Sequence, residues 1–152
     1  MNLVRLIYAS RMTPSCGPKE LKQILDISRK KNEAKGITGV LGYDSETFLQ
    51  CLEGAQDVVN ELYRTIIMDE RHKDVTLIGH GSIDQRNFEK WSMAYLNVED
   101  YSKDVAFKFG VARKFDPFSM NETQAMAFLV HIVTEHQGFL EEQLAKMQKS
   151  RS

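Results

Sequence analysis

The sequence predicts an α+β fold of the ferredoxin-like type, with a five-stranded mixed sheet in the order βαββαββ. Three observations support this prediction: a strongly apolar strand comes first, two short amphipathic helices separate pairs of predicted strands, and a β-hairpin lies between these helices. Short helices between strand pairs place both helices on one face of the sheet. The C-terminal third of the chain then supplies helices for the other face.

The first predicted strand is Leu3–Ser10, with Val4 and Tyr8 on one face and Ile7 on the other. Since both faces are largely apolar, we expect this strand to lie inside the sheet, with a neighbour on each side.

The first predicted helix begins near Pro18, which suits a first helical turn, and runs to about Asn32. Its apolar stripe ends in Ser28 and Asn32 rather than in aliphatic residues. Ser28 could bond the preceding turn and Asn32 could cap the helix. Both could equally bind a ligand, and the helix pattern leaves the two interpretations open.

Two apolar runs flank Asp44-Ser45-Glu46 between Gly36 and Gly54, a pattern typical of a β-hairpin. In its second strand, Gln50 lies on the same face as Phe48, which is otherwise apolar. An unpaired buried amide there would cost about 1–3 kcal/mol. Gln50 therefore needs a polar partner, which could be a neighbouring side chain, a water molecule or a ligand.

A second helix is predicted at Gln56–Met68, and further strands at Val75–Ser82 and Trp91–Val98. In the last strand, Trp91 and Met93 alternate onto one face, where each could be an ordinary core residue.

The C-terminal third is predicted to be helical. A short helix is expected near residues 102–112, and Ser119–Glu122 resembles a capping box that opens a longer helix, which Gly138 would interrupt. We expect residues 1–98 to form one domain and residues 99–152 a helical cap or output extension.

Composition excludes several classes of partner. The chain has 152 residues and a net charge of −1, so charge gives no reason to expect nucleic-acid or acidic-membrane binding. Cys16 and Cys51 lie far apart, and Cys51 is expected to pack in the core. No apolar run is long enough for a membrane span, and a cytoplasmic location is expected.

The helix-covered face gathers polar groups between apolar helical stripes. It shows no nucleophile–base pair, no paired carboxylates and no metal-ligand spacing, because the four histidines fall on different predicted elements. No enzyme and no metal site are therefore expected. Such a slot suits a flat heterocycle pressed between Ile24 and Ile66. The polar and aromatic groups on or near this face are Tyr8, Ser28, Asn32, Gln50, Trp91 and Met93.

Five segments, in order and at matching spacing, give the sequence a family resemblance. They are Leu6-Ile-Tyr8-Ala-Ser10, Asn32 followed by Gly36-Ile-Thr-Gly39, Phe48-Leu-Gln50-Cys-Leu-Glu-Gly54, Asp69-Glu-Arg-His72 and Asn87-Phe-Glu-Lys-Trp91-Ser-Met93. Together they resemble the BLUF domains, blue-light sensors that bind FAD, over Leu3 to about Val98. The length resembles the short, stand-alone subgroup with a C-terminal helical cap.

The resemblance implies that Tyr8 and Gln50 form the photoactive pair beside a flavin, FAD or alternatively FMN. After excitation Tyr8 would give up an electron and then a proton through Gln50, and the glutamine would rearrange its hydrogen bonds. The result would be a slightly red-shifted spectrum that decays in the dark. Trp91 and Met93 would carry the signal through the last strand to the C-terminal helices.

The resemblance also implies the other cofactor contacts. Lys31 stands where relatives often carry an amide or histidine, so the phosphate side would rely on charge. Whether Arg64 or Thr65 meets the phosphate end stays open. The cofactor-binding residues implied are Tyr8, Ile24, Ser28, Lys31, Asn32, Phe48, Gln50, Ile66, Asp69, Arg71 and His72.

Output would pass to an effector or transcriptional-regulator protein, or through self-association. Two other functions compete: a small ferredoxin-like enzyme that uses Asp69, Arg71 and His72 on a phosphorylated substrate, and an interaction module that has lost photochemistry. The intact Tyr8–Gln50 pair argues against the second. The basic segment Arg29-Lys30-Lys31 is interpreted as a solvated helix end or a phosphate neighbour.

Overall fold

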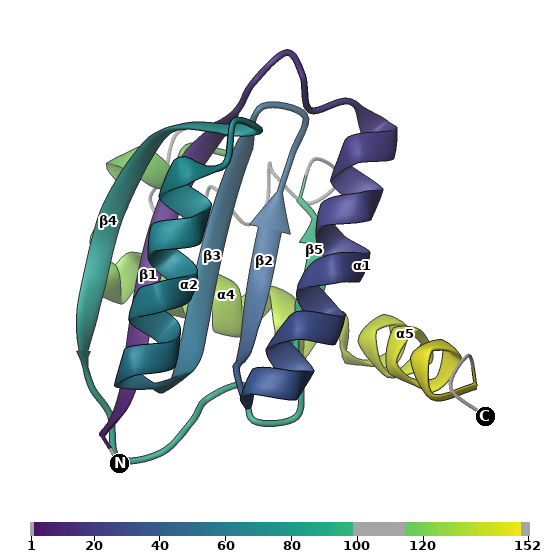
Figure 1. The fold of residues 1–152 in the computed structure, drawn as a ribbon. Helices are drawn as coiled ribbons and strands as arrows, with labels where there is room; N and C mark the ends of the chain where they lie inside the picture. Colours follow the sequence, from purple (N-terminus) through teal and green to yellow (C-terminus); the bar gives the residue numbers. More distant parts are fainter. Residues whose placement is uncertain (1, 99–114, 150–152) are drawn as a thin grey trace.

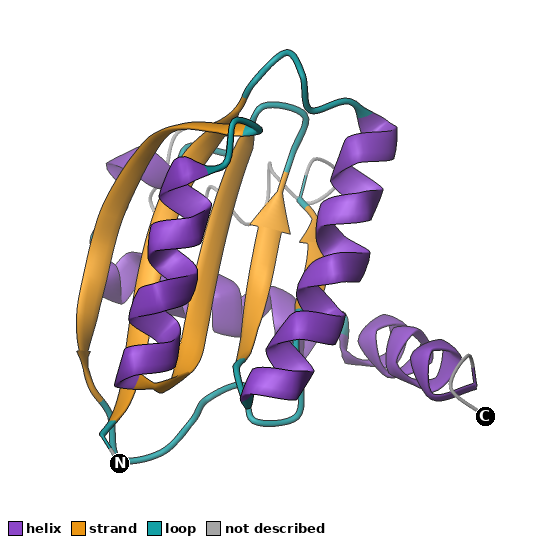
Figure 2. Cartoon of the chain, viewed as in Figure 1, coloured by secondary structure: helices purple, strands orange, loops and turns teal. Residues whose placement is uncertain are grey.

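A computed structural model describes residues 2–98 and 115–149, with the side chains of residues 147–149 left aside. It has three layers (Figures 1 and 2). Helices α1 (Pro18–Lys35) and α2 (Gln56–Met68) cover one face of a five-stranded sheet, and α4 (Glu122–Glu135) covers the other. The predicted α+β class and the placement of the first two helices are confirmed. The predicted helix near 102–112 lies outside the described residues.

The sheet has the strand order β4-β1-β3-β2-β5. Strand β1 (Leu3–Met12) pairs antiparallel with both β3 (Thr47–Ala55) and β4 (His72–Ser82), so the predicted interior position is confirmed. Strand β2 (Thr38–Tyr43) pairs antiparallel with β3 and parallel with β5 (Ala94–Asn97), which makes the sheet mixed.

The hairpin between β2 and β3 turns at Asp44-Ser45-Glu46, as the sequence predicts. The Asp44 carboxylate Oδ1 accepts hydrogen bonds from the backbone amides of Glu46 and Thr47, each at 2.8 Å, and from the Thr47 hydroxyl at 2.7 Å. An aspartate that binds the amides two and three residues ahead is a common way of closing a turn. This turn fixes the register that places Gln50.

Helix α1 is three residues longer than predicted and ends at Lys35. Gly36 follows in the left-handed conformation, with φ of +70°, and its amide bonds the carbonyls of Asn32 and Glu33. A glycine in this conformation is a usual helix C-cap. The interpretation of the Asn32 side chain as the cap is therefore wrong. Helix α2 has the predicted bounds.

Two strands differ from prediction. Strand β4 begins at His72 rather than Val75, and β5 covers only Ala94–Asn97 instead of Trp91–Val98. Trp91 and Met93 therefore precede the strand, and the strand alternation assumed for them does not apply.

A buried carboxylate holds the irregular segment that leads to Trp91. Glu53 is fully buried and forms an ion pair with Arg5 at 2.8 Å. It also accepts hydrogen bonds from the amides of Asn87 at 3.1 Å and Phe88 at 2.8 Å. Because these charge-assisted contacts converge on one carboxylate, Glu53 fixes this segment against the sheet.

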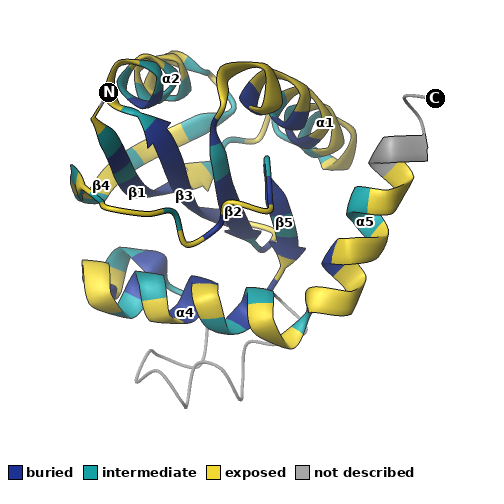
Figure 3. Ribbon diagram, turned by 90° about the horizontal axis from the view of Figure 1, so that it is seen from below, coloured by how far each residue is buried: buried dark blue, intermediate teal, exposed yellow. Residues whose placement is uncertain are grey.

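The face opposite α1 and α2 is covered by α4, which contributes Phe128, Leu129 and Ile132 to a core shared with Ile7 and Leu49 (Figure 3). Cys51 packs in this core, as predicted, and both cysteines are free.

The predicted cap of the long helix is displaced by two residues. Pro117–Ser119 forms a short 3-10 helix, and the capping box is made by Asn121 and Gln124 instead of Ser119 and Glu122. The asparagine side chain accepts from the Gln124 amide at 2.8 Å. The predicted break near Gly138 occurs at His136, and α5 (Gln137–Lys149) then runs past the β5 edge towards α1 (Figures 1 and 3).

Candidate functional site

The register of β1 and β3 brings Tyr8 directly opposite Gln50. Both side chains point to the face under α1 and α2, and both are buried. The Tyr8 hydroxyl donates a hydrogen bond to Gln50 Oε1. Burial strongly raises the pKa of Tyr8, with smaller contributions from Tyr63 and Asp69, so its phenol stays protonated at neutral pH.

The other end of the Gln50 amide meets a sulfur atom. Gln50 Nε2 donates to Met93 Sδ at 3.3 Å. A thioether accepts hydrogen bonds but has none to donate, whereas a neutral phenol can donate or accept. The Met93 sulfur therefore favours the orientation in which the amide nitrogen lies towards Met93 and the amide oxygen accepts from Tyr8. Two of the polar partners of Gln50 are therefore protein side chains.

Trp91 and Met93 lie on opposite sides of the sheet, contrary to the prediction that they share a face. Met93 belongs to the core on the α1–α2 side with Tyr8, whereas Trp91 packs in the core on the α4 side with Ile7. The reason is that β5 begins only at Ala94, so strand alternation does not extend back to Trp91.

Helix α1 binds the segment that carries Met93 through two neighbouring carbonyls. Asn32 Nδ2 donates to the carbonyl of Ser92 at 3.2 Å, and Arg29 Nε donates to the carbonyl of Met93 at 3.0 Å. The Arg29 guanidinium also lies 3.9 Å from the centre of the Tyr95 ring. Arg29 is only 7% exposed, so the interpretation of this residue as part of a solvated helix end is wrong.

A cavity of about 180 Å³ opens between α1, α2 and the sheet next to these groups. Every residue named from the sequence as a cofactor contact lines it. The lining also contains residues that were not predicted as contacts, and Thr65 lies in it whereas Arg64 does not. Among the described residues, those that line the cavity are Tyr8, Ile24, Ile27, Ser28, Lys31, Asn32, Lys35, Leu41, Phe48, Gln50, Leu62, Thr65, Ile66, Asp69, Arg71 and His72.

Sequence reasoning missed two of the important residues, although signals for them exist. Arg29 lies four residues after Leu25 and three before Asn32, which are the other buried positions of α1, so helical spacing marks its face. Leu41 lies opposite Gln50 in the β2–β3 register. Each follows from a pattern that the sequence contains.

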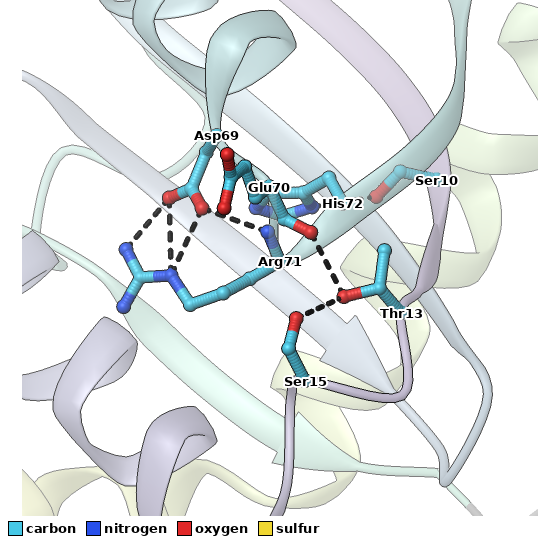
Figure 4. A network of polar contacts seen from close by, with 7 residues as sticks. All are labelled: Ser10, Thr13, Ser15, Asp69, Glu70, Arg71 and His72. Carbon is cyan, nitrogen blue, oxygen red and sulfur yellow. Dashed lines mark hydrogen bonds and ion pairs between the residues drawn. The ribbon is translucent and has the colours of Figure 1, made fainter.

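The segment between α2 and β4 contributes Asp69 and Arg71 to the cavity lining. Figure 4 shows the polar contacts of this segment. Arg71 binds the Asp69 carboxylate through two nitrogens, with Nη2 at 2.6 Å and Nε at 2.9 Å. These hydrogen bonds hold the pKa of Asp69 below its usual value. The Glu70 carbonyl accepts from the Thr13 hydroxyl at 2.8 Å, which ties the segment to the loop after β1.

His72 begins β4 and packs against the site. Its ring centre lies 4.9 Å from that of Phe48, and its Nδ1 lies 2.9 Å from the Ser10 hydroxyl. Burial lowers the pKa of His72; Asp69 opposes this effect and Arg71 adds to it. The imidazole is therefore neutral at pH 7.

The lowered pKa of His72 makes stability depend on pH. Below its ordinary pKa of 6.5, the unfolded chain takes up a proton that the folded protein resists, so stability falls as pH decreases from 6.5 towards the folded-state pKa. We expect the urea midpoint to fall between pH 7.5 and 5.5, and to fall less in His72→Gln. His80→Gln, at an exposed position of the same strand, is the control and should keep the wild-type slope. If the urea midpoint changed with pH equally in both variants, His72 would not be the source of this pH dependence.

The described residues offer little for other chemistry. Across 2–98 and 115–149, no group of three or more histidine, cysteine, aspartate or glutamate side chains is placed to hold a metal ion. His72 and His80 share β4, which corrects the prediction that all four histidines lie on different elements. Among the helices that the structure describes, none combines the length and apolar composition needed to cross a bilayer.

The fold and this cavity define a small α+β domain with a buried Tyr–Gln pair at the cavity wall. The family model "Sensors of blue-light using FAD" matches residues 3–94. The chain belongs to this family, the BLUF domains, and the predicted family is confirmed.

Solved structures and curated relatives agree with this membership. The structure of BlsA in its photo-activated state has 35% sequence identity to this chain and a TM-score of 0.76, and the match covers 84% of this chain and 91% of the BlsA chain. The dark-state structure of BlrB has 28% sequence identity to this chain and a TM-score of 0.73, and the match covers 87% of this chain and 95% of the BlrB chain.

The curated relatives are longer proteins. The antirepressor BluF of Escherichia coli (strain K12), regulated by blue light and temperature, is 28% identical over 67% of this chain and a quarter (25%) of its own length. The photoactivated adenylate cyclase subunit beta of Euglena longa is 29% identical over 75% of this chain, which spans 14% of that protein.

Proposed function

We propose that this chain is a blue-light sensor in which Tyr8 and Gln50 respond to an excited flavin and Met93 transmits the response to a partner protein. The observation that carries the proposal is the continuous hydrogen-bonded series Tyr8–Gln50–Met93 at the cavity wall. Membership in the family of blue-light sensors supports it.

The cavity residues fit a flavin. Ile24 and Ile66, from α1 and α2, offer apolar walls for a flat ring system. A ring edge that carries carbonyl oxygens and ring nitrogens would find hydrogen-bonding groups on Ser28, Asn32 and Gln50.

The same cavity offers positive charge for a phosphate. Lys31 and Arg71 both line it, one from α1 and the other from the segment between α2 and β4. We propose FAD as the cofactor, because the family consists of sensors of blue light that use FAD. FMN is the alternative, because the similar protein BlrP1 of Klebsiella pneumoniae has been solved with FMN and cyclic diGMP.

When bound, the flavin supplies absorption of blue light and a one-electron oxidant. Loss of an electron would make the Tyr8 phenol a strong acid, and Gln50 Oε1, which already accepts its hydrogen bond, would be the acceptor for its proton. A neutral amide suits this place because it can accept at one end and donate at the other without carrying charge in a buried site.

Rearrangement of Gln50 changes what Met93 meets. Rotating the amide by half a turn directs its nitrogen at Tyr8 and its oxygen at the Met93 sulfur. Sulfur and carbonyl oxygen are both acceptors, so the 3.3 Å contact loses its hydrogen bond and Met93 is driven to another position. A tautomer of the amide would change the same contact. Met93 thereby converts the orientation of the Gln50 amide into a displacement of the segment that leads into β5.

We propose that the output of this chain is a protein–protein contact rather than catalysis. Some relatives are adenylate cyclases by name, and this chain spans only a small part of them. The competing enzyme proposal relies on Asp69, Arg71 and His72. It is weaker because Asp69 is held by Arg71 and His72 lies against Ser10, which leaves no acid–base pair directed at a substrate. An effector or regulator protein, or a second copy of the chain, would read the C-terminal helices.

The test is the visible spectrum of the purified protein, in the dark and directly after blue light. We expect bound flavin whose bands shift slightly to the red and recover in darkness, and we expect this shift to be lost in Gln50→Leu. Flavin that binds but shows no reversible shift would refute the sensor proposal. A protein that cannot be loaded with flavin would return the Asp69–His72 segment to consideration.

A further inference from the structure

We propose that Arg29 is the residue that couples Met93 to helix α5, so that movement of the Met93 backbone changes the contact between α5 and the sensor core. This inference rests on the proposed function, because it needs a light-dependent change at Met93. It adds a residue and a route that the Tyr8–Gln50–Met93 series does not contain.

Met93 has contacts of two kinds that point in different directions. Its sulfur accepts from Gln50 at 3.3 Å, and its backbone carbonyl accepts from Arg29 Nε at 3.0 Å. The side chain thus responds to the glutamine while the main chain holds the arginine. A shift of Met93 that reaches its backbone acts on the Arg29 hydrogen bond.

Arg29 reaches α5 with the opposite end of its guanidinium. Its Nη2 donates to Gln143 Oε1 at 2.6 Å, a contact across 114 positions of the sequence. The guanidinium is planar and lies 3.9 Å from the centre of the Tyr95 ring. A rigid plane confined against an aromatic ring transmits movement from Nε to Nη2, which a flexible lysine would not do.

Burial makes these contacts costly to lose. Desolvation lowers the pKa of Arg29, while Tyr95 and Asp26 raise it. The charged form of the buried guanidinium is therefore stabilised by its neighbours. A buried charge that loses a hydrogen-bonding partner is strongly destabilised. Arg29 therefore favours arrangements in which Met93 and Gln143 are both within reach, and the two contacts are expected to change together.

Helix α5 is held to the rest of the molecule by few contacts, which suits a responsive element. Among its described side chains, only Leu140 is buried, and Phe139 is 52% exposed. Its second polar contact is the ion pair between Glu141 and Lys90 at 2.9 Å, where both side chains are about half exposed. Removing the Arg29 contact therefore removes the part-buried polar contact between α5 and the sensor core and leaves the exposed ion pair.

The test measures amide hydrogen exchange of residues 137–149 by mass spectrometry, in the dark and under continuous blue light, on the flavin-loaded full chain. Gln143→Leu removes the acceptor from α5 while keeping a good helix former. Arg29→Met removes the cation. Glu141→Gln, two residues from Gln143 on the same helix, is the matched control because it removes the charge of the exposed ion pair and leaves the Arg29–Gln143 contact in place.

We expect wild-type protein and Glu141→Gln to show faster exchange of α5 in the light than in the dark. In Gln143→Leu and Arg29→Met this light–dark difference should be lost, although the flavin red shift persists in all four proteins. A purely structural role would raise exchange equally in light and dark and leave the difference intact.

The outcomes separate this inference from the proposed function. Absence of a red shift in the wild type refutes the proposed function itself. A red shift without any light–dark difference in α5 overturns the coupling alone. A light–dark difference that survives in Gln143→Leu also overturns the coupling. This variant leaves the cavity residues and Arg29 in place, so it tests the coupling even where Arg29→Met fails to fold.

Discussion

Replacing Tyr8 with phenylalanine is expected to abolish the light-induced red shift while the protein still binds flavin. Phenylalanine keeps the ring and its packing in the buried position but removes the hydroxyl that donates to Gln50 Oε1. Without it, no proton can pass to the amide, and Gln50 Oε1 loses the donor that it has in Tyr8. The expected loss is complete, measured as the difference between spectra recorded in the dark and after blue light.

Tyr63→Phe is the matched control. The Tyr63 ring centre lies 5.6 Å from that of Tyr8, so both variants remove a hydroxyl from one aromatic cluster. Tyr63 is only partly buried, on α2, and the hydrogen bond to Gln50 comes from Tyr8. We expect Tyr63→Phe to keep the red shift. A red shift of normal size in Tyr8→Phe would exclude Tyr8 as the residue that responds to the excited cofactor.

The Tyr8–Gln50 pair could be placed from the sequence because regular strands have a period of two. Alternation assigned both residues to the helix-covered face, and the short turn at Asp44 limits the register of the hairpin. The apolar stripes of the helices were predictable because a helix repeats about every 3.6 residues. Regular geometry therefore accounts for much of the cavity wall, although the roles of its residues toward a flavin stay predictions.

The segment before β5 could not be placed in this way because it is not regular. Its path is set by contacts between residues far apart in sequence: Glu53 binds the amides of Asn87 and Phe88, and α1 binds the carbonyls that follow. Treating Trp91–Val98 as one strand put Trp91 on the wrong side of the sheet. Sequence periodicity predicts side-chain directions only in regular strands and helices. It does not predict them in a segment whose backbone N–H and C=O groups form hydrogen bonds with side chains instead of with a neighbouring strand.

Arg29 was misassigned for a related reason. A run of three basic residues at a helix end is usually solvated, but the apolar stem of arginine can cross a buried surface while its head finds polar partners. Here those partners are a carbonyl exposed by the irregular segment and an amide from α5. Neither could be placed before the tertiary structure was known.

Replacing Glu53 with alanine is expected to produce the largest loss of stability. The fully buried carboxylate pairs with Arg5 at 2.8 Å and accepts two backbone amides, so its removal leaves a partly buried guanidinium and two amide groups without their acceptor. Breaking a buried ion pair by removing one partner costs about 3–5 kcal/mol. We expect a loss of this size in urea unfolding of the flavin-loaded protein.

Glu141→Ala is the control, because Glu141 also pairs with a basic side chain but both partners are about half exposed. Exposed ion pairs contribute little, so we expect no measurable change in the urea midpoint. Glu53→Gln should fall between the two, since the amide keeps the shape and one acceptor oxygen but loses the charge. If Glu53→Ala were as stable as Glu141→Ala, the carboxylate would not be what fixes residues 86–91, and the position of Met93 beside Gln50 would have to depend on α1 alone.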